Sequence, residues 1–254
     1  IGIPFVGSDV SSAAIAQDKI FQKQIYQSAN IPTTDFVWFF DSEYLDDNEK
    51  IIKMVEKLKY PVMVKPATLG SSVGINKAHN RDELQRAIED AITYDNKVIV
   101  EEVVDNLVEV NISVLGNYEH MQYSVIEQVM TDNELLTYED KYIGSSKKTG
   151  GASKGMASAS RKIPADIDDK LKEEVQSNAL EVFRTLNCSG VVRIDFLIDK
   201  KKKKVYVNEI NSIPGSLAFY LWEPIDKNYS ELLDEMINVA IKNYKKRINK
   251  VHSF

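Results

Sequence analysis

The spacing of apolar residues along the chain predicts an alternation of helices and short strands. Apolar side chains from Ile15 to Tyr26 fall near helical spacing and predict a first helix over 11–29, which Pro32 ends. The same spacing predicts further helices over 51–58, 84–91, 166–187 and 232–244. Runs rich in β-branched and aromatic residues predict strands over 36–40, 60–66, 98–103, 108–114, 123–129, 191–199 and 205–210. The pattern therefore predicts a mixed α/β protein.

Two stretches without periodicity predict loops. Residues 70–74, Gly-Ser-Ser-Val-Gly, follow the strand that ends at Pro66. Residues 144–160 are small, polar and basic, which is typical of a mobile loop. Between these stretches, Asn80 and Glu83 have the spacing of a capping box and predict the start of a helix.

Composition narrows the class of protein. The chain has 254 residues, of which 43% are hydrophobic and 28% charged, and this composition excludes disorder, collagen and a bare coiled coil. The length allows one large domain or two ordinary ones, and we expect two domains. The net charge of -6 argues against a protein that coats nucleic acid. A single cysteine, Cys188, excludes an intrachain disulfide and a multi-thiolate metal site, and it favours a reducing compartment. No apolar run reaches the roughly 18 residues of a membrane span.

The first residues suggest a fragment. The chain opens with Ile1 rather than Met, and residues 1–7 read like a strand entered in the middle of a protein. If the chain is a fragment, the absence of a signal or transit segment says nothing about where the protein is located, because the true N-terminus would lie upstream of Ile1.

Charged residues on two predicted strands form a candidate metal site. Arg193 and Asp195 are two apart and share a face, and so do Glu209 and Asn211 on the next strand. A hairpin centred near Lys202 would place Arg193 opposite Asn211 and Asp195 opposite Glu209. Facing carboxylates repel unless a cation lies between them, and this oxygen set suits Mg²⁺. The alternative is an exposed hairpin face with an ordinary salt bridge.

A metal held by few protein oxygens usually binds together with substrate phosphates, so a phosphate site is expected elsewhere. Residues 70–74, just after Lys65, offer backbone N–H groups and hydroxyls to phosphate oxygens. They match neither a Walker A sequence nor a dinucleotide fingerprint, and the alternative is an ordinary loop. The default interpretation of Lys19 and Lys65 is that both are solvated surface lysines. The default interpretation of Glu101 and Glu102 is that they form the end of a strand, exposed to water.

Two segments beside the hairpin complete this picture. The turn at 211–215, Asn-Ser-Ile-Pro-Gly, leaves the metal strand where a backbone N–H can meet a substrate. The five lysines at 200–204 are more simply a solvated hairpin tip than a nucleic-acid site.

The ordered set of these segments resembles the ATP-grasp enzymes, and closely the D-alanine–D-alanine ligases. The segments that carry the resemblance are Asp18-Lys19, Lys65-Pro66, 70–74, 100–102, 138–142, 192–195 and 208–215, within a span from Pro4 to about Pro224. The resemblance implies an α/β (α+β) fold in which two subdomains clasp ATP. Its domain boundaries would be the end of an N-terminal region with an entry helix in 1–30, a small central subdomain in 31–105 and a C-terminal subdomain in 106–254.

The resemblance also implies roles for single residues. Contacts with ATP are implied for Lys19, Lys65, Ser71, Ser72, Glu101, Glu102, Val103, Val104, Glu109, Lys141, Asn208 and Glu209. Ligation of two Mg²⁺ ions, or of Mn²⁺, is implied for Asp195, Glu209 and Asn211. Catalytic roles are implied for Ser71, Tyr142, Arg193 and Gly215, and substrate contacts for Arg193, Gly215, Tyr220 and Leu221. Lys141 and Tyr142 would belong to a loop that closes over the site.

The function implied is an ATP-dependent ligase that forms D-alanyl-D-alanine through an acyl phosphate, for peptidoglycan precursor synthesis in the cytoplasm. Its partners would be ATP and D-alanine, with no nucleic acid or membrane, and a homodimer is left open. The alternatives are an ATP-grasp ligase for a different second amino or hydroxy acid, and a nucleotide-binding module without catalysis. Two departures from the family are expected. The family's N-terminal domain would lie upstream of Ile1 if the chain is a fragment, and Tyr220, in the run 216–224, stands in a region that is Ser-rich in well-known members.

Overall fold

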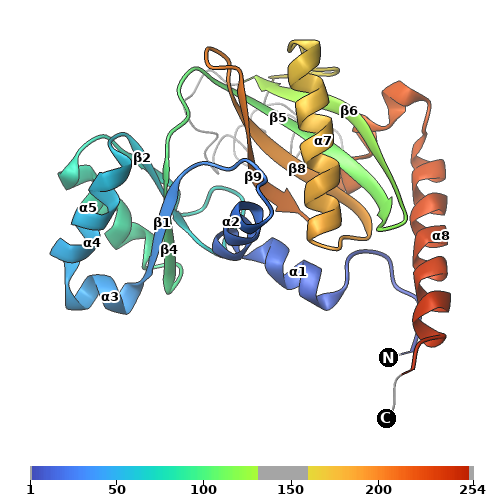
Figure 1. Cartoon of the computed structure of the whole chain (residues 1–254), viewed down its shortest axis with the longest axis horizontal. Helices are drawn as coiled ribbons and strands as arrows, with labels where there is room; N and C mark the ends of the chain where they lie inside the picture. The colour runs from blue at the N-terminus through green and yellow to red at the C-terminus, as the bar shows by residue number, and fades with distance from the viewer. Residues whose placement is uncertain (1, 131–159, 252–254) are drawn as a thin grey trace, which may run out of the picture.

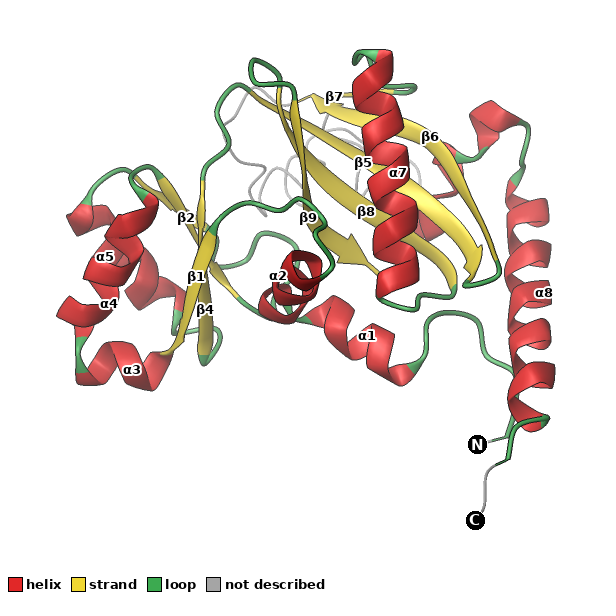
Figure 2. Ribbon diagram, in the orientation of Figure 1, coloured by secondary structure: helices red, strands yellow, loops and turns green. Residues whose placement is uncertain are grey.

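The computed structural model describes residues 2–130 and 160–251, and within these residues the strands form two antiparallel sheets (Figures 1 and 2). The first sheet has the strand order β1-β4-β2-β3 and the second has the order β7-β6-β5-β8-β9. The mixed α+β architecture expected from the sequence is confirmed. No helix among the described residues combines the length and the apolarity that crossing a membrane requires.

The first sheet is covered on its outer face by three helices. Its strands are β1 (Phe36–Phe40), β2 (Val62–Pro66), β3 (Asn76–Ala78) and β4 (Lys97–Glu102). The helices are α3 (Asp41–Asp46), α4 (Asn48–Val55), which continues into a 3₁₀ turn at Glu56–Leu58, and α5 (Arg81–Ala91). Ile52, Leu84 and Val100 are among the fully buried residues between these layers. Asn80 caps α5 as expected, because its Oδ1 accepts from the backbone N–H of Glu83, 3.0 Å away. The full capping box is not formed, because the Glu83 carboxylate accepts from the backbone N–H of His79 at 2.9 Å instead of that of Asn80.

The second sheet is larger and has one apolar face. Its strands are β5 (Leu107–Asn117), β6 (His120–Met130), β7 (Ser160–Lys162), β8 (Gly190–Asp199) and β9 (Lys204–Asn211). Helix α7 (Asp169–Thr185) crosses this face in Figure 1, and Val182 and Phe183 pack on Ile112 and Ile194 beneath it. The opposite face carries the polar residues described below.

Helices α1 (Val10–Gln17) and α2 (Lys19–Ser28) lie beside the junction of the two sheets (Figure 1). Ile20 packs with Ala67 and Ile99 of the first sheet's side, whereas Tyr26 belongs to the core of the second sheet. The predicted single helix over 11–29 is therefore wrong. Asp18 breaks it, because its extended backbone and its carboxylate, which accepts from Ile20 N–H at 2.9 Å, start a new helix.

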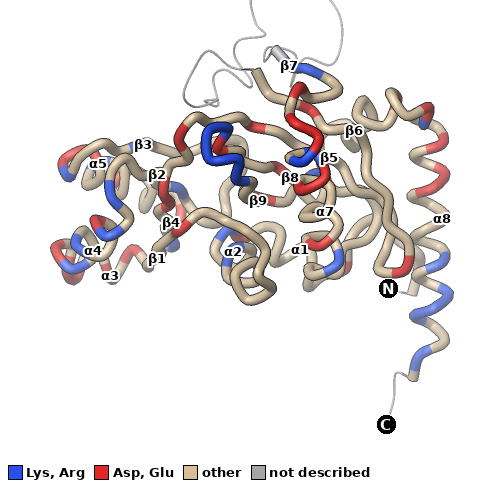
Figure 3. The backbone as a smooth tube through the Cα atoms, turned by 45° about the horizontal axis from the view of Figure 1, so that its top comes forward, with Lys and Arg blue, Asp and Glu red and all other residues tan. Residues whose placement is uncertain are grey.

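The C-terminal part covers the far end of the second sheet. A 3₁₀ segment η2 (Gly215–Leu221), a short η3 (Glu223–Ile225) and helix α8 (Tyr229–Ile248) follow β9. Trp222 and Leu232 are fully buried against Leu115 in a separate cluster. Figure 3 shows basic residues along the last turns of α8 and at the β8–β9 hairpin tip. Sequence periodicity missed the short α3, and the loop predicted over 144–160 lies outside the described residues except for the start of β7.

The core of the second sheet can be tested by substitution at Ile112. Replacing Ile112 with alanine should lower the free energy of unfolding by about 2–5 kcal/mol, because the side chain is fully buried beneath α7. Urea denaturation followed by circular dichroism measures the loss. Leu45→Ala on the exposed face of α3 is the control and should change stability by less than about 0.5 kcal/mol. Equal losses in both variants would contradict this assignment of the core.

Candidate active site

A row of polar residues crosses the second sheet on the face opposite α7. Glu127 on β6 pairs with Asn111 on β5, Asn111 pairs with Asp195 on β8, and Asp195 pairs with Glu209 on β9. The next row places Ser113 beside Arg193. Directly opposed residues on neighbouring strands have close Cβ atoms, so oxygen atoms from four strands gather on one face.

The hairpin register predicted from the sequence is confirmed. Arg193 lies opposite Asn211 and Asp195 lies opposite Glu209. This register depends on a bulge, because the pairing shifts by one residue between Asp195 and Phe196. The shift leaves Asn208 as the extra residue in β9.

The Arg193 side chain is tied to Asp195. Nε donates to Oδ1 at 2.7 Å and Nη2 to Oδ2 at 2.8 Å, a bidentate pair whose side chains are only 15% and 24% exposed. The Asp195 carboxylate raises the pKa of the Arg193 guanidinium above its ordinary value, so the charge is permanent. The salt bridge of the alternative interpretation is therefore present, but it is mostly buried rather than on an exposed hairpin face.

Lys19 and Lys65 approach this row from the other sheet. Both are more than nine-tenths buried, so the default interpretation of solvated lysines is wrong. Lys65 Nζ, from β2, lies 3.4 Å from Asn208 Oδ1, and Lys19 Nζ, at the start of α2, lies 3.7 Å from Glu209 Oε2. The ammonium groups of Lys65 from β2 and Lys19 from α2 thus lie close to side-chain oxygen atoms of β9, where the two sheets meet.

Behind Lys65 lies a buried carboxylate. Glu101 is 2% exposed, which excludes the interpretation of a strand end in water, and its Oε2 lies 3.0 Å from Lys65 Nζ and 3.5 Å from Lys23 Nζ. Burial alone would raise the pKa of Glu101, but Lys23 and Lys65 outweigh it and hold the pKa at about 2. Burial lowers the pKa of Lys23 to about 8, against the attraction of Glu101. Within the described residues, Glu101 Oε1 has no hydrogen-bond partner.

The glycine-serine loop is a tight, strained turn. Ser71 and Ser72 have φ values of 57° and 61°, and Val73 N–H donates to the Gly70 carbonyl at 3.3 Å. Left-handed backbone at two successive serines is unfavourable and is typical of functional turns. Gly74 (φ +67°) leaves no room for a side chain, because a Cβ there would lie 2.8 Å from atoms of Pro66 and Tyr94.

The remaining expected nucleotide contacts lie where the chain passes between the sheets. Val103 and Val104 follow β4 and are half-buried, and Glu102 accepts from Asp35 N–H at 3.2 Å. Glu109 lies on β5, on the same side as Asn111. Lys141 and Tyr142 lie outside the described residues.

The substrate segment begins with a left-handed turn. Gly215 is exposed, and Ser216, Leu217 and Ala218 all have φ values between 51° and 55°. Tyr220 then turns back to the polar row, where its hydroxyl donates to Glu127 Oε2 at 3.0 Å. Burial and then Glu127 raise the pKa of Tyr220 to about 12, so it stays protonated and can donate. 

Leu221 does not line the site. It is fully buried in the cluster with Trp222 and Leu232, because its side chain supplies part of the apolar contact that anchors η2. The side chain therefore has a packing role, and the substrate contact expected for Leu221 stays a prediction.

The donor set fits a hard divalent cation by chemistry and register. Asp195 and Glu209 face each other, and each carboxylate oxygen of Asp195 keeps lone-pair capacity beyond its bond to Arg193. The Asn211 amide oxygen accepts from Ile213 N–H at 3.1 Å and lies on the same face. Among the described residues no cluster of three His, Cys, Asp or Glu side chains suits a metal, so the carboxylate pair would depend on Asn211 and on ligand oxygens.

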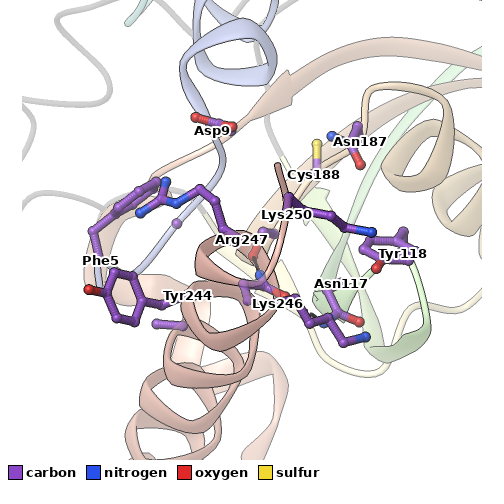
Figure 4. A pocket seen from close by; sticks show the side chains of 14 residues that line it. Phe5, Asp9, Asn117, Tyr118, Asn187, Cys188, Tyr244, Lys246, Arg247 and Lys250 are labelled. Carbon is purple, nitrogen blue, oxygen red and sulfur yellow. Dashed lines mark hydrogen bonds between the residues drawn. The ribbon is translucent and has the colours of Figure 1, made fainter. Parts of the chain in front are cut away.

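A pocket of about 290 Å³ lies elsewhere, between the N-terminal segment and the end of α8 (Figure 4). Phe5, Cys188 and Arg247 are among the residues that line it, and none of the expected site residues does. Burial raises the pKa of Cys188 to about 12, so this thiol is protonated and unreactive.

Sequence reasoning missed four polar residues of the site. Lys23, Asn111, Glu127 and Arg161 were not singled out, although Arg161 lies 4.9 Å over the Tyr220 ring and 3.4 Å from Glu127. Lys23 had a usable signal, since it follows Lys19 by four residues and shares its helix face. The others had none, because their partners are distant in sequence.

The fold and this site define an ATP-grasp protein. A family described as "D-ala D-ala ligase C-terminus" matches residues 25–238, and the chain belongs to this family. It is 39% identical over 248 residues to the D-alanine–D-alanine ligase of Acetivibrio thermocellus, and it covers 62% of that protein while 96% of the chain is matched.

Two solved structures share the architecture. The VanG D-Ala:D-Ser ligase of Enterococcus faecalis is 30% identical with a TM-score of 0.78, covering 94% of this chain and 66% of that one. The D-alanine–D-alanine ligase of Bacillus anthracis complexed with ATP is 24% identical with a TM-score of 0.75, covering 97% and 73%, and this likeness shows the fold alone.

Acid should destabilise the protein through Glu101. Because its pKa is lowered from 4.5 to about 2, its stabilising contribution is present above about pH 4.5 and is lost as the pH falls toward 2. Urea unfolding at about pH 5, 4 and 3 should show a steeper loss in the wild type than in Glu101→Gln. Parallel pH profiles for the two proteins would contradict the buried, ionised carboxylate.

Proposed function

We propose that this chain is the ATP-binding and catalytic part of a ligase that joins two D-alanine molecules at the expense of ATP, in peptidoglycan precursor synthesis. The observation that carries the proposal is the junction at β9, where Lys19 and Lys65 meet the oxygen atoms of Asn208 and Glu209. The lysines that could bind phosphates thus lie beside Glu209, a carboxylate that could bind a metal ion. Because the chain spans less than two thirds of the relative from Acetivibrio thermocellus, the activity of the whole protein is inferred rather than assigned.

Lys19, Lys65 and the Ser71–Ser72 turn would hold the phosphates. The two ammonium groups offset phosphate charge in a largely buried setting, where such attractions are strong. The left-handed turn presents backbone N–H groups beside the serine hydroxyls, which suits phosphate oxygens. We place the adenine and ribose where the chain crosses between the sheets, along Glu101, Glu102, Val103, Val104 and Glu109.

Asp195, Glu209 and Asn211 would hold magnesium. When bound, the metal supplies positive charge to the phosphate oxygens. Arg193, fixed by its bidentate pair with Asp195, would stabilise the negative charge that develops on the substrate, together with the Gly215 N–H.

The reaction has two steps. The carboxylate of the first D-alanine attacks the γ-phosphorus, which forms an acyl phosphate and releases ADP. The amine of the second D-alanine then attacks the acyl carbon, the carbon–nitrogen bond forms, and inorganic phosphate leaves. Arg193 would hold the oxyanion of the tetrahedral intermediate, and Lys141 and Tyr142 would belong to the covering loop. We also propose domain boundaries between residues 30 and 31 and between residues 105 and 106. The location proposed is the cytoplasm, because ATP is supplied there. No nucleic-acid partner is proposed, and a homodimer is left open.

The metal ligands can be tested at Asp195. Asp195→Asn should lower kcat by about a hundredfold or more in the full gene product, because it removes a charged ligand and frees Arg193. ADP release with D-alanine, measured at several Mg²⁺ concentrations, checks this. Asp166→Asn, an exposed carboxylate paired with Lys162, is the control. Unchanged turnover in Asp195→Asn would remove the metal proposal.

The second substrate is tested at Tyr220. Since its hydroxyl is bound to Glu127 beside Arg193, Tyr220→Phe should raise KM for the second amino acid by about tenfold and leave KM for ATP unchanged. The assay compares D-alanine with D-serine and D-lactate as the acceptor. A wild-type preference for D-serine or D-lactate would support the alternative of a different second substrate. An equal rise in both KM values for Tyr220→Phe would contradict a role at that subsite.

A further inference from the structure

The buried side chain of Lys23 has no place in the proposed reaction, yet it occupies the centre of the charge cluster. It is 1% exposed, and its ammonium group donates to Thr33 Oγ1 at 2.8 Å and Thr34 Oγ1 at 2.7 Å. A lysine so enclosed cannot touch a phosphate. Burying its charge is costly, so a role for it must act through a neighbour.

That neighbour is Glu101. Its Oε2 lies 3.5 Å from Lys23 Nζ, 3.0 Å from Lys65 Nζ and 3.4 Å from Thr34 Oγ1. The pKa of the carboxyl is held low by Lys23 first, then Lys65 and Lys19, so Glu101 is ionised at neutral pH. One carboxylate therefore faces three lysines among the described residues.

Lys65 connects this cluster to the ligand side. Its ammonium has three N–H donors, of which the contacts with Glu101 and Asn208 use two. Lys65 is already the nearer cation, 3.0 Å from Glu101 Oε2 against 3.5 Å for Lys23. If Lys23 were uncharged, Lys65 would have to neutralise more of this buried carboxylate, and less of its charge would be available to a ligand.

We propose that Lys23 is a positioning residue: by neutralising Glu101 it leaves the positive charge of Lys65 available to the phosphates of the nucleotide. The inference rests on the proposed role of Lys65 as a phosphate ligand. It predicts an effect that depends on phosphate and on the charge of Lys65, which a purely structural lysine would not produce.

The test compares two ligands in a double-mutant cycle, measured by titration calorimetry on the chain. Lys23→Met keeps the length of the side chain and removes its charge. It should weaken ATP binding by about tenfold, which corresponds to the loss of one charge-assisted hydrogen bond. Adenosine, which has no phosphate, should bind within about twofold of wild type. When Lys65→Met has already removed the charge of Lys65, adding Lys23→Met should weaken ATP binding by less than about twofold.

A matched control is Lys227→Met, which removes a partly buried lysine paired with Glu235 on α8, away from Glu101. It should leave both affinities unchanged. Three results would overturn the inference alone: unchanged ATP affinity in Lys23→Met, an equal loss for ATP and adenosine, or a further tenfold loss when Lys23→Met is added to Lys65→Met. Failure of the unmodified chain to bind ATP would overturn the proposed function and this inference together.

Discussion

The arrangement of the site depends on charges buried together where the two sheets meet. Lys65 reaches from β2 to Asn208 of β9, while Glu101 anchors it from behind. Buried ions are costly to desolvate, and the cost is offset only when partners are close and well placed. Here Lys23 is a second partner of Glu101, and the hydroxyl groups of Thr33 and Thr34 accept hydrogen bonds from Lys23. Short polar contacts between buried groups therefore connect the two sheets at this junction.

The second sheet can carry both a core and a site because its two faces differ. Val205, Val207 and Ile210 of β9 all enter the core beneath α7, although alternation would turn Ile210 outward. The bulge at Asn208 solves this conflict by adding one residue. As a result, Glu209 stands opposite Asp195, and Asn208 is presented to Lys65. A strand without the bulge would separate these groups.

Backbone strain is concentrated in two expected ligand segments. Ser71 and Ser72 adopt left-handed conformations in the glycine-serine turn, and Ser216, Leu217 and Ala218 do so after Gly215. Such residues persist only where surrounding packing holds them. Gly74 packs against Pro66 and Tyr94 at the first turn, and buried Ala218, Leu221 and Trp222 anchor the second. Neighbouring residues thus pack against both segments and support their strained backbone.

The sequence by itself determined the fold class and most helices and strands, because apolar periodicity is a local property. The pairing of Asp195 with Glu209 was predicted correctly, but it depends on the bulge at Asn208, which two-residue alternation does not show. It could not determine that Lys19 and Lys65 are buried, since a lone lysine looks the same in water or in a charge cluster. The break at Asp18 was also hidden, because apolar spacing continues across it. The places of Glu127 and Asn111 in the site were decided by tertiary structure alone. These residues lie opposite each other only because β5 pairs with β6, and Tyr220, which bonds to Glu127, comes from a distant segment of the chain.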